Sequence, residues 1–203
     1  MEDLFNPHTT EKDIVNDNNG RMSIRRASFT RKVTQNKRNI GFAEILKENG
    51  GLPKKGECLL IKSNGTSDTG SLFHCMAQTG TIEEMYLSTW IISRSNIDYI
   101  CEQVDKGKIK SLTFIVSTRM NQMSGGSGKA TYAYLVESFQ KRPQIKFRTC
   151  NCHAKTFSCK IKDNYYTSTG SGNWTKNPRI ENYILINDIE PFLHNKEWMS
   201  ELI

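Results

Sequence analysis

The sequence has no long hydrophobic run. None of its apolar stretches approaches the roughly 20 residues that a membrane-spanning helix needs, so we expect no membrane partner. The first ten residues are polar, begin with acidic side chains and lack the apolar segment of a signal peptide. Six cysteines in a chain without an export signal are expected to be reduced thiols, because disulfides form mainly in oxidising compartments. A cytoplasmic location follows as the default expectation.

Apolar residues are scarce as well, at 36% of 203 residues, which indicates that part of the chain is tail rather than core. Residues 1–38 fit that description, because they are first polar and then basic, with few large apolar side chains. We expect them to form a flexible, disordered arm. This arm either neutralises nucleic-acid phosphates or is a solvated tail. Its basic residues are Arg21, Arg25, Arg26, Arg31, Lys32, Lys37 and Arg38.

Charge of one sign is in excess, with a net charge of +7. A basic balance favours an anionic partner such as nucleic acid, although it says nothing about the fold. No segment has the amphipathic pattern of a membrane-surface helix, so DNA or RNA is favoured over a lipid substrate.

The remainder of the chain reads as one folded unit. Residues 39–56 are predicted to form a short helix and a linker, and residues 57–203 to form the compact domain. Within the domain, strand-like and helix-like patterns alternate, which predicts an α/β fold with a mixed, mostly buried β-sheet flanked by helices. Ser95 is the predicted N-cap of one helix. The expected strands cover residues 58–61, 84–93, 110–117, 144–150, 152–159, 165–169 and 181–186, and the expected helices cover residues 71–79, 95–105 and 132–140.

One histidine and one lysine stand two residues apart, at His153 and Lys155. If residues 152–159 form a strand, both side chains project from the same face, because side chains on a strand repeat with period two. The lysine can then hold a phosphate oxygen next to a histidine that attacks phosphorus or protonates a leaving group.

A turn of small residues, Gly170-Ser171-Gly172-Asn173, follows that pair, and an acid, Glu181, begins the next predicted strand. Glycines allow the backbone to approach a ligand closely. Ser171 and Asn173 add a hydroxyl group and an amide group. Together with His153 and Lys155, these residues predict a phosphate site.

This order of residues resembles the HxK…GSxN…E signature of the phospholipase D-like superfamily, in its nuclease-type branch. The resemblance implies a metal-independent, cofactor-free phosphodiesterase with a phospholipase D-like fold. His153 would be the nucleophile and would form a covalent phosphohistidine. Glu181 would orient the imidazole. Lys155, Asn173 and Ser171 would bind the phosphoryl oxygens.

The chain departs from the family pattern at one position. The usual HxKxxxxD spacing would place an aspartate where this chain has Lys160, and Asp163 is out of register. This departure keeps an alternative open, which is a nucleic-acid-binding protein that retains the fold and turns over weakly or not at all.

The resemblance also implies a second histidine, which would protonate the leaving oxygen. We count a single HxK motif, because His74 is followed by Cys-Met and His194 by Asn-Lys, and His8 also stands outside the motif. Single-motif members resemble small bacterial nucleases that share one site across a two-fold axis. We therefore expect a homodimer in which the two His153 side chains meet.

Other residues have rival interpretations. The loop over residues 124–129 is similar to a phosphate-binding loop, but Lys129 is followed by Ala130, which breaks the GxxxxGK[ST] pattern. Lys129 can still meet a phosphate from a mobile loop, and Arg179 can widen the phosphate-binding surface. Trp174 is predicted to be a core residue rather than a base-stacking platform. A zinc site would have unusual C-x-C-H spacing; its ligands would be Cys150, Cys152, His153 and Cys159.

Overall fold

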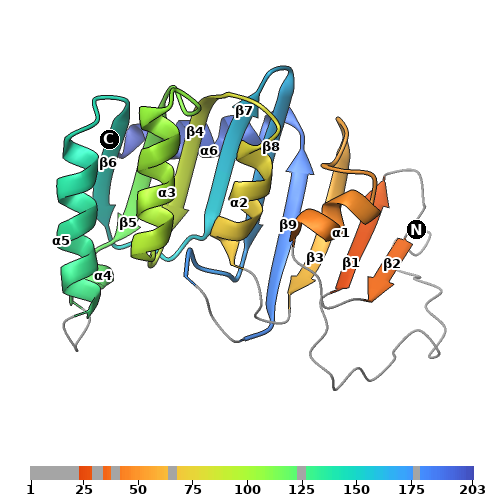
Figure 1. Ribbon diagram of the computed structural model, residues 1–203, viewed down its shortest axis with the longest axis horizontal. Coiled ribbons are helices and arrows are strands. Elements are labelled where there is room, and N and C mark those ends of the chain that lie inside the picture. Colours follow the sequence, from red (N-terminus) through yellow and green to blue (C-terminus); the bar gives the residue numbers. More distant parts are fainter. Residues whose placement is uncertain (1–22, 29–33, 38–41, 64–67, 123–126, 176–178) are drawn as a thin grey trace, which may run out of the picture.

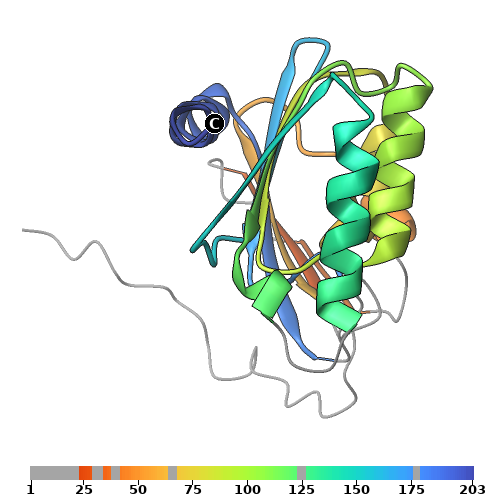
Figure 2. The same ribbon diagram turned by 90° about the vertical axis from the view of Figure 1, so that its left-hand side faces the viewer.

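A computed structural model describes residues 23–28, 34–37, 42–63, 68–122, 127–175 and 179–203. These residues form a nine-stranded mixed sheet with helices on both faces, which confirms the predicted α/β class (Figures 1 and 2). The strands are β1 (Ser23–Ser28), β2 (Thr34–Lys37), β3 (Glu57–Ser63), β4 (Ile82–Thr89), β5 (Leu112–Ser117), β6 (Ile145–Cys150), β7 (Thr156–Ile161), β8 (Asn164–Gly170) and β9 (Glu181–Asn187). The helices are α1 (Phe42–Glu48), α2 (Thr69–Ala77), α3 (Arg94–Asp105), α4 (Arg119–Gln122), α5 (Ser127–Gln140) and α6 (Ile189–Glu201).

The strands are arranged in the order β2-β1-β3-β9-β8-β7-β4-β5-β6. Strands β4, β5 and β6 run parallel, and every other neighbouring pair is antiparallel. The last residues of β4 therefore lie beside the first residues of β7, with Ser88 opposite Thr156. Gly170, at the end of β8, pairs with Tyr183 near the start of β9. We call this end of the sheet, at the bottom of Figure 1, the site end.

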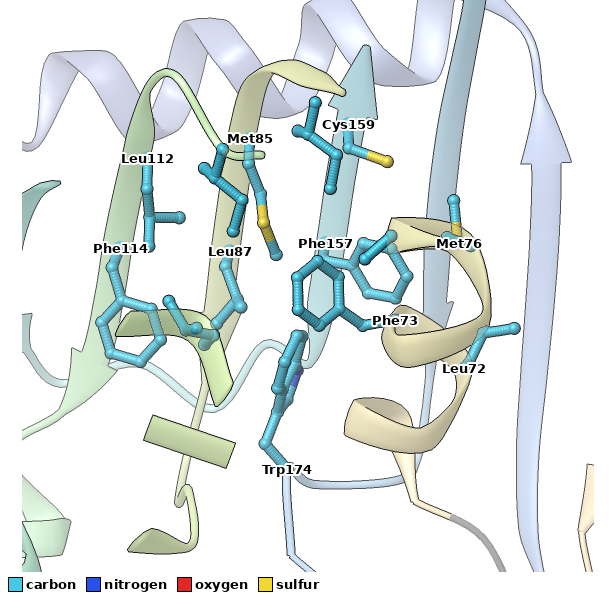
Figure 3. Close-up of a cluster of buried hydrophobic side chains, with 14 of the residues drawn as sticks. Leu72, Phe73, Met76, Met85, Leu87, Leu112, Phe114, Phe157, Cys159 and Trp174 are labelled. Carbon is cyan, nitrogen blue, oxygen red and sulfur yellow. The ribbon is translucent and has the colours of Figure 1, made fainter. Parts of the chain in front are cut away.

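Helices α1, α2, α3 and α5 cover one face of the sheet, and α6 crosses the other (Figure 2). The larger core lies under the first group. In it Phe73 of α2 packs edge-to-face against Phe157, at 6.3 Å between ring centroids (Figure 3). Trp174 is fully buried beside both rings, which confirms the prediction that it is a core residue. A smaller core under α6 contains Tyr86, Ile115, Phe192 and Met199.

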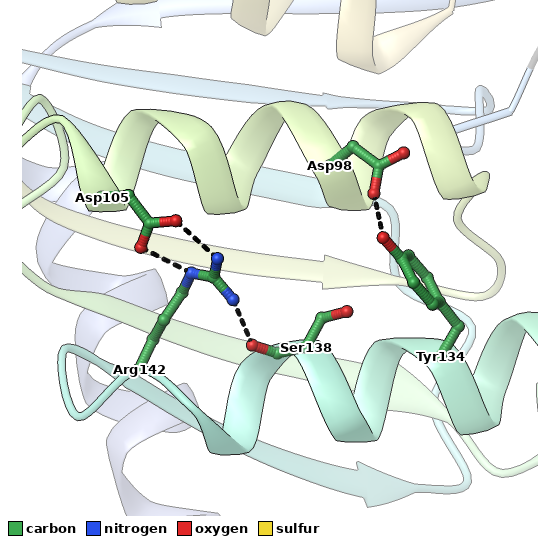
Figure 4. Close-up of polar contacts among 5 residues, drawn as sticks. All are labelled: Asp98, Asp105, Tyr134, Ser138 and Arg142. Atoms are coloured by element: carbon green, nitrogen blue, oxygen red, sulfur yellow. Dashed lines mark hydrogen bonds and ion pairs between the residues drawn. The ribbon is translucent and has the colours of Figure 1, made fainter.

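Helices α3 and α5 are joined by two polar contacts on their outer surface (Figure 4). Arg142 makes a bidentate ion pair with Asp105, at 2.8 and 2.5 Å, and donates to the Ser138 carbonyl. The guanidinium holds the pKa of the Asp105 carboxyl below its usual value. Tyr134 donates to Asp98 near the other end of the pair. These contacts hold α5 alongside α3.

Sequence and structure differ at several elements, of which the first three are a helix cap, the end of a strand and helix α6. Ser93, not Ser95, caps α3, because its hydroxyl accepts the Asn96 N–H at 3.3 Å. The predicted strand over 84–93 ends at Thr89, which leaves Trp90 outside it. Helix α6 was not predicted, because its buried residues are few and spaced among polar ones. No helix in the described part of the chain is long and apolar enough to cross a membrane.

The expected disordered arm also differs in part. Strand β1 pairs antiparallel with β3, and β2 pairs with β1. These ten residues are assigned to strands at the edge of the sheet, where backbone pairing does not require apolar side chains. Of the basic residues in the arm, Arg25, Arg26 and Lys37 lie on β1 and β2. The others, Arg21, Arg31, Lys32 and Arg38, lie outside the described residues.

Candidate active site

The starts of two helices hold the glycine-rich turn at the site end. Thr69 Oγ1, at the first residue of α2, donates to the Gly172 carbonyl at 2.8 Å, and the Thr69 N–H donates to the Asn173 carbonyl at 3.3 Å. Asn96, in the first turn of α3, donates through Nδ2 to the Trp174 carbonyl at 2.9 Å. Buried hydrogen bonds of this kind are costly to leave unmade, so the turn has a defined path.

Two glycines in the turn lie against neighbouring groups that leave no room for a side chain. A Cβ atom on Gly170 would overlap the Asn182 carbonyl oxygen of β9. A Cβ atom on Gly172 would overlap the Tyr183 hydroxyl. The turn therefore packs directly against β9, and this close approach is the reason for glycine at both positions.

His153 and Lys155 come together, but not on a strand as the period-two argument assumed. Strand β7 begins at Thr156, and both residues lie in the segment before it, which has no regular secondary structure. Lys155 Nζ lies 3.2 Å from His153 Nδ1, 3.3 Å from its Nε2 and 3.1 Å from its carbonyl oxygen. The Lys155 ammonium group thus lies beside both ring nitrogens of His153, and the tautomer of the imidazole decides which of them can accept a hydrogen bond.

Sequence reasoning missed Trp90 as a residue of this site. Trp90 directly follows β4, and its ring packs against His153 at 5.0 Å between centroids. Lys155 Nζ lies 5.9 Å from the centroid of the same ring. The indole limits the positions open to both side chains. The only signal for Trp90 in the sequence was an aromatic residue within the apolar run over residues 84–93.

Ser171 links the turn to the acid. Its hydroxyl donates to the Glu181 carboxylate and accepts the Asn182 N–H at 3.0 Å, so its proton is directed at Glu181. The Glu181 side chain is buried, at 8% exposure. Burial lowers the pKa of Lys155, and the charge of Glu181 opposes that lowering. The acid therefore acts on the lysine electrostatically.

A cleft of about 700 Å³ opens beside these groups on the face of the sheet that carries α6. One wall contains His153, Lys155 and Ser171. The opposite wall is formed by α6. The residues that line the cleft from β8, β9 and α6 are Thr167, Thr169, Gly170, Ile186, Pro191, His194, Asn195 and Trp198.

Four residues of the predicted phosphate site are absent from the cleft lining: Glu181, which is hydrogen-bonded to Ser171, and the three described next. Asn173 has its backbone in the held turn, but its Oδ1 atom is buried without a hydrogen-bond partner among the described residues. Lys129 is an exposed residue in the first turn of α5, which begins at the site end (Figure 1). Arg179 is exposed just before β9. Their roles in phosphate binding stay predictions.

Lys160, the departure from the family pattern, lies far from the site. It is near the opposite end of β7, where its Nζ pairs with Glu83 Oε2 at 2.5 Å. An aspartate at this position would face an acidic neighbour, so Lys160 suits the local charge and has no contact with the His153 region.

The count of one HxK motif was wrong, because the sequence contains a second HxK triplet, His194-Asn195-Lys196. The two motifs differ in structure. Residues two apart on a helix do not face each other. Of His194 and Lys196, only His194 lines the cleft, while Lys196 Nζ pairs with Glu84 Oε2 at 2.6 Å. The second motif therefore brings a histidine to the cleft but no lysine.

The proposed zinc ligands are divided by the sheet. Cys159 is fully buried in the larger core, whereas Cys150 and Cys152 pack against the smaller core under α6. All six cysteines are free. Among the described residues, no three His, Cys, Asp or Glu side chains are grouped so that they could hold a metal ion.

No family model matches the sequence, and no curated protein matches it. Three solved structures are similar over much of this chain. Phosphatidylserine synthase from Haemophilus influenzae Rd KW20 has 15% identity and a TM-score of 0.49, over 70% of this chain and 38% of that one. TrmBL2, an archaeal chromatin protein, has 14% identity and a TM-score of 0.46, over 70% of this chain and 51% of that one. Polyphosphate kinase from Porphyromonas gingivalis has 13% identity and a TM-score of 0.46, over 64% and 23%.

This chain thus spans about two fifths of the phosphatidylserine synthase it resembles. At these identities and scores the similarities assign no activity and no family. The functional argument therefore rests on His153, Lys155 and Ser171 at the cleft, with Glu181 hydrogen-bonded to Ser171.

The lowered pKa of Lys155 has a measurable consequence for anion binding. Burial disfavours the ammonium form, so the charge of Lys155 is lost at a pH below the ordinary lysine value of 10.5. We expect affinity for inorganic phosphate to fall as the pH rises through that lowered pKa. The Lys155→Arg variant should keep its affinity to higher pH, because the guanidinium stays charged. Titration calorimetry over a pH series measures both, and identical profiles for the two proteins would contradict the prediction.

Proposed function

We propose that this protein is a metal-independent phosphodiesterase that cleaves nucleic acid, related to the nuclease-type branch of the phospholipase D-like superfamily. One observation carries the proposal: Lys155 Nζ lies 3.2 Å from a ring nitrogen of His153 at the wall of a cleft. The proposed nucleophile, His153, and the proposed phosphate-binding cation, Lys155, are thus adjacent at the cleft wall. Ser171, from the GSxN part of the pattern, lines the same cleft and is hydrogen-bonded to Glu181.

The reaction has two steps. In the first, a ring nitrogen of His153 attacks phosphorus, a P–N bond forms, and the bond from phosphorus to the leaving oxygen breaks. The leaving oxygen takes a proton from a general acid. In the second, water attacks the phosphohistidine, the P–N bond breaks, and the acid recovers its proton from the water. One product carries a free hydroxyl group and the other a phosphate monoester.

The remaining residues stabilise the charge that develops on the phosphoryl oxygens. The Lys155 ammonium lies beside the attacking ring and supplies positive charge in a partly buried setting, where it acts more strongly than in water. Ser171 places its hydroxyl between the cleft and Glu181. We infer that the Glu181 carboxylate favours the charged form of Lys155 and fixes the turn through its hydrogen bond with Ser171. Its role in orienting the His153 imidazole stays a prediction.

Nucleic acid is the favoured substrate because of charge. The chain carries a net charge of +7, and neutralisation of phosphates by Lys and Arg supplies most of the non-specific affinity for nucleic acids. Three of the predicted nucleic-acid-binding residues lie on β1 and β2, in the same sheet as the site.

A second candidate is a nucleic-acid-binding protein that keeps this arrangement without turnover. The position of Asn173 favours it, because the amide oxygen of this residue is buried and its side chain is not part of the described cleft lining. A phosphodiesterase would be expected to direct that amide at the substrate.

Two histidines are candidates for the general acid that protonates the leaving oxygen. From the sequence, we predicted that His153 of a second copy would supply it in a homodimer. The described cleft is also lined by His194 of the same chain, which is a second candidate for the acid.

Cleavage in the presence of EDTA tests the proposed function. We expect the wild-type protein to cleave a DNA or RNA oligonucleotide in EDTA, and Lys155→Gln to lower the rate by roughly 10²–10³-fold, the usual cost of removing one preorganised charge-stabilising donor. Lys62→Gln, at an exposed lysine on β3, is the matched control and should leave the rate unchanged. Loss of cleavage in EDTA would contradict a metal-independent mechanism. Binding without cleavage under all conditions would favour the second candidate.

A further inference from the structure

Helix α6 crosses the uncovered face of the sheet and closes one side of the cleft (Figure 2). Besides the apolar contacts of Phe192 and Met199, one buried polar residue, Asn195, joins the helix to β7. Asn195 Nδ2 donates to Thr156 Oγ1 at 3.0 Å and to Ser158 Oγ at 2.8 Å, and its Oδ1 accepts the Trp198 Nε1–H at 2.9 Å. Asn195 is only 6% exposed, so its amide satisfies its hydrogen bonds within the protein.

The anchor of the helix is therefore the first residue of β7, Thr156, which directly follows Lys155 in the chain. His194 is the residue before Asn195. The hydrogen bonds of Asn195 thus set the position of His194 relative to the segment that carries His153. The next residue, Lys196, is held elsewhere, over the Tyr86 ring at 6.0 Å.

The cleft has the size of a binding site for a small molecule or a short segment of a polymer. Its volume of about 700 Å³ lies within the usual range for ligand sites. His153 lines it from the sheet side and His194 from the helix side. The His194 side chain is exposed, so it is accessible to a ligand and to solvent protons.

We propose that His194 is the general acid of the site, so that one chain holds both imidazoles. This inference rests on the proposed phosphodiesterase function. While His153 attacks phosphorus, His194 transfers its ring proton to the leaving oxygen as the P–O bond breaks. In the second step the resulting neutral His194 accepts a proton from the water that attacks the phosphohistidine, and the initial protonation states are restored.

The closing experiment compares two substrates that differ in their leaving group. A DNA oligonucleotide has an alkoxide leaving group that needs a proton, whereas thymidine p-nitrophenyl phosphate has a nitrophenolate that leaves without one. His194→Ala should lower oligonucleotide cleavage by about 10²–10⁴-fold, the usual contribution of general acid catalysis, and should change release of nitrophenolate little. His153→Ala should abolish both reactions. Glu197→Ala, an exposed neighbour on α6, is the control and should change neither.

A mixing experiment separates this site from one shared between two copies. The wild-type chain is refolded with a roughly tenfold excess of His153→Ala, and activity is expressed per wild-type chain. With both histidines in one chain that activity stays constant. With a site built from two His153 residues it falls about tenfold, because most wild-type chains then pair with a variant chain.

Each result decides between the explanations. Equal loss on both substrates in His194→Ala would mean that the residue holds the structure or binds substrate, and would overturn its role as an acid. An unchanged oligonucleotide rate, or the fall on mixing, would also overturn it while leaving the proposed function intact. If the wild-type protein cleaves neither substrate, the proposed function fails and this inference fails with it.

Discussion

Replacing His153 with alanine is expected to abolish cleavage of nucleic acid. The imidazole is the nucleophile in the proposed mechanism, and removal of an enzyme nucleophile lowers turnover by about 10³-fold or more. His153 is exposed at the wall of the cleft, so the substitution should leave the free energy of unfolding almost unchanged. The measurements are oligonucleotide cleavage in EDTA and urea denaturation of both proteins.

Detection of a covalent phosphohistidine adduct by mass spectrometry tests the role of His153 more directly than the cleavage rate. With the wild-type protein, rapid quenching without acid should reveal a protein mass increased by the phosphoryl-linked part of the substrate, located on the peptide that contains His153. The adduct should be missing in His153→Ala and present in Asn151→Ala, an exposed neighbour outside the cleft lining. Oligonucleotide binding should survive in both variants. Cleavage by His153→Ala at the wild-type rate would remove this histidine from the mechanism.

Replacing Gly170 with alanine is expected to damage both the fold and the site. The added Cβ atom would overlap the Asn182 carbonyl oxygen, which belongs to the backbone of β9 and cannot rotate away. Gly170 is paired with Tyr183, and its N–H donates to the Lys155 carbonyl at 3.3 Å. The substitution therefore separates the segment with Lys155 from the strand with Glu181.

The expected cost in unfolding free energy is about 1–3 kcal/mol, which is typical of overpacking a close contact. The cleavage rate should fall by about 10²-fold, since misplacement of a reacting group by about 1 Å has that effect. Thr169→Ala, at the exposed neighbouring position, should change the unfolding free energy by no more than about 0.5 kcal/mol. Wild-type stability and activity in Gly170→Ala would mean that β9 can move without disturbing the site.

Much of the fold was predictable because local patterns agree with the tertiary structure. The strand predicted over 110–117 is β5, in which every residue is buried. The helix predicted over 95–105 is α3, whose apolar spacing places Ile97, Ile100 and Val104 in the core. Helix α6 was missed because only three of its residues are buried, and one of them, Asn195, is an amide that hydrogen-bonds to β7. A hydrogen bond to another strand leaves no periodic signal in the sequence.

The candidate site was predictable only in part for the same kind of reason. The order of His153, Lys155, the glycine-rich turn and Glu181 is visible along the chain. Trp90 and His194 are not, because they belong to other elements and are separated from His153 by many residues. A single sequence carries no record of such long-range contacts.

The sequence by itself thus determined which functional groups this protein can use: a histidine, a lysine, a turn of small residues with a hydroxyl and an amide, and an acid. These follow from the chemistry and size of individual residues. The tertiary structure decided where they meet. It placed His153 and Lys155 before β7 rather than on it, turned Ser171 toward Glu181, and brought His194 across the cleft by anchoring α6 through Asn195. The physical reason is that these positions depend on packing and hydrogen bonds between distant segments, which no local pattern specifies.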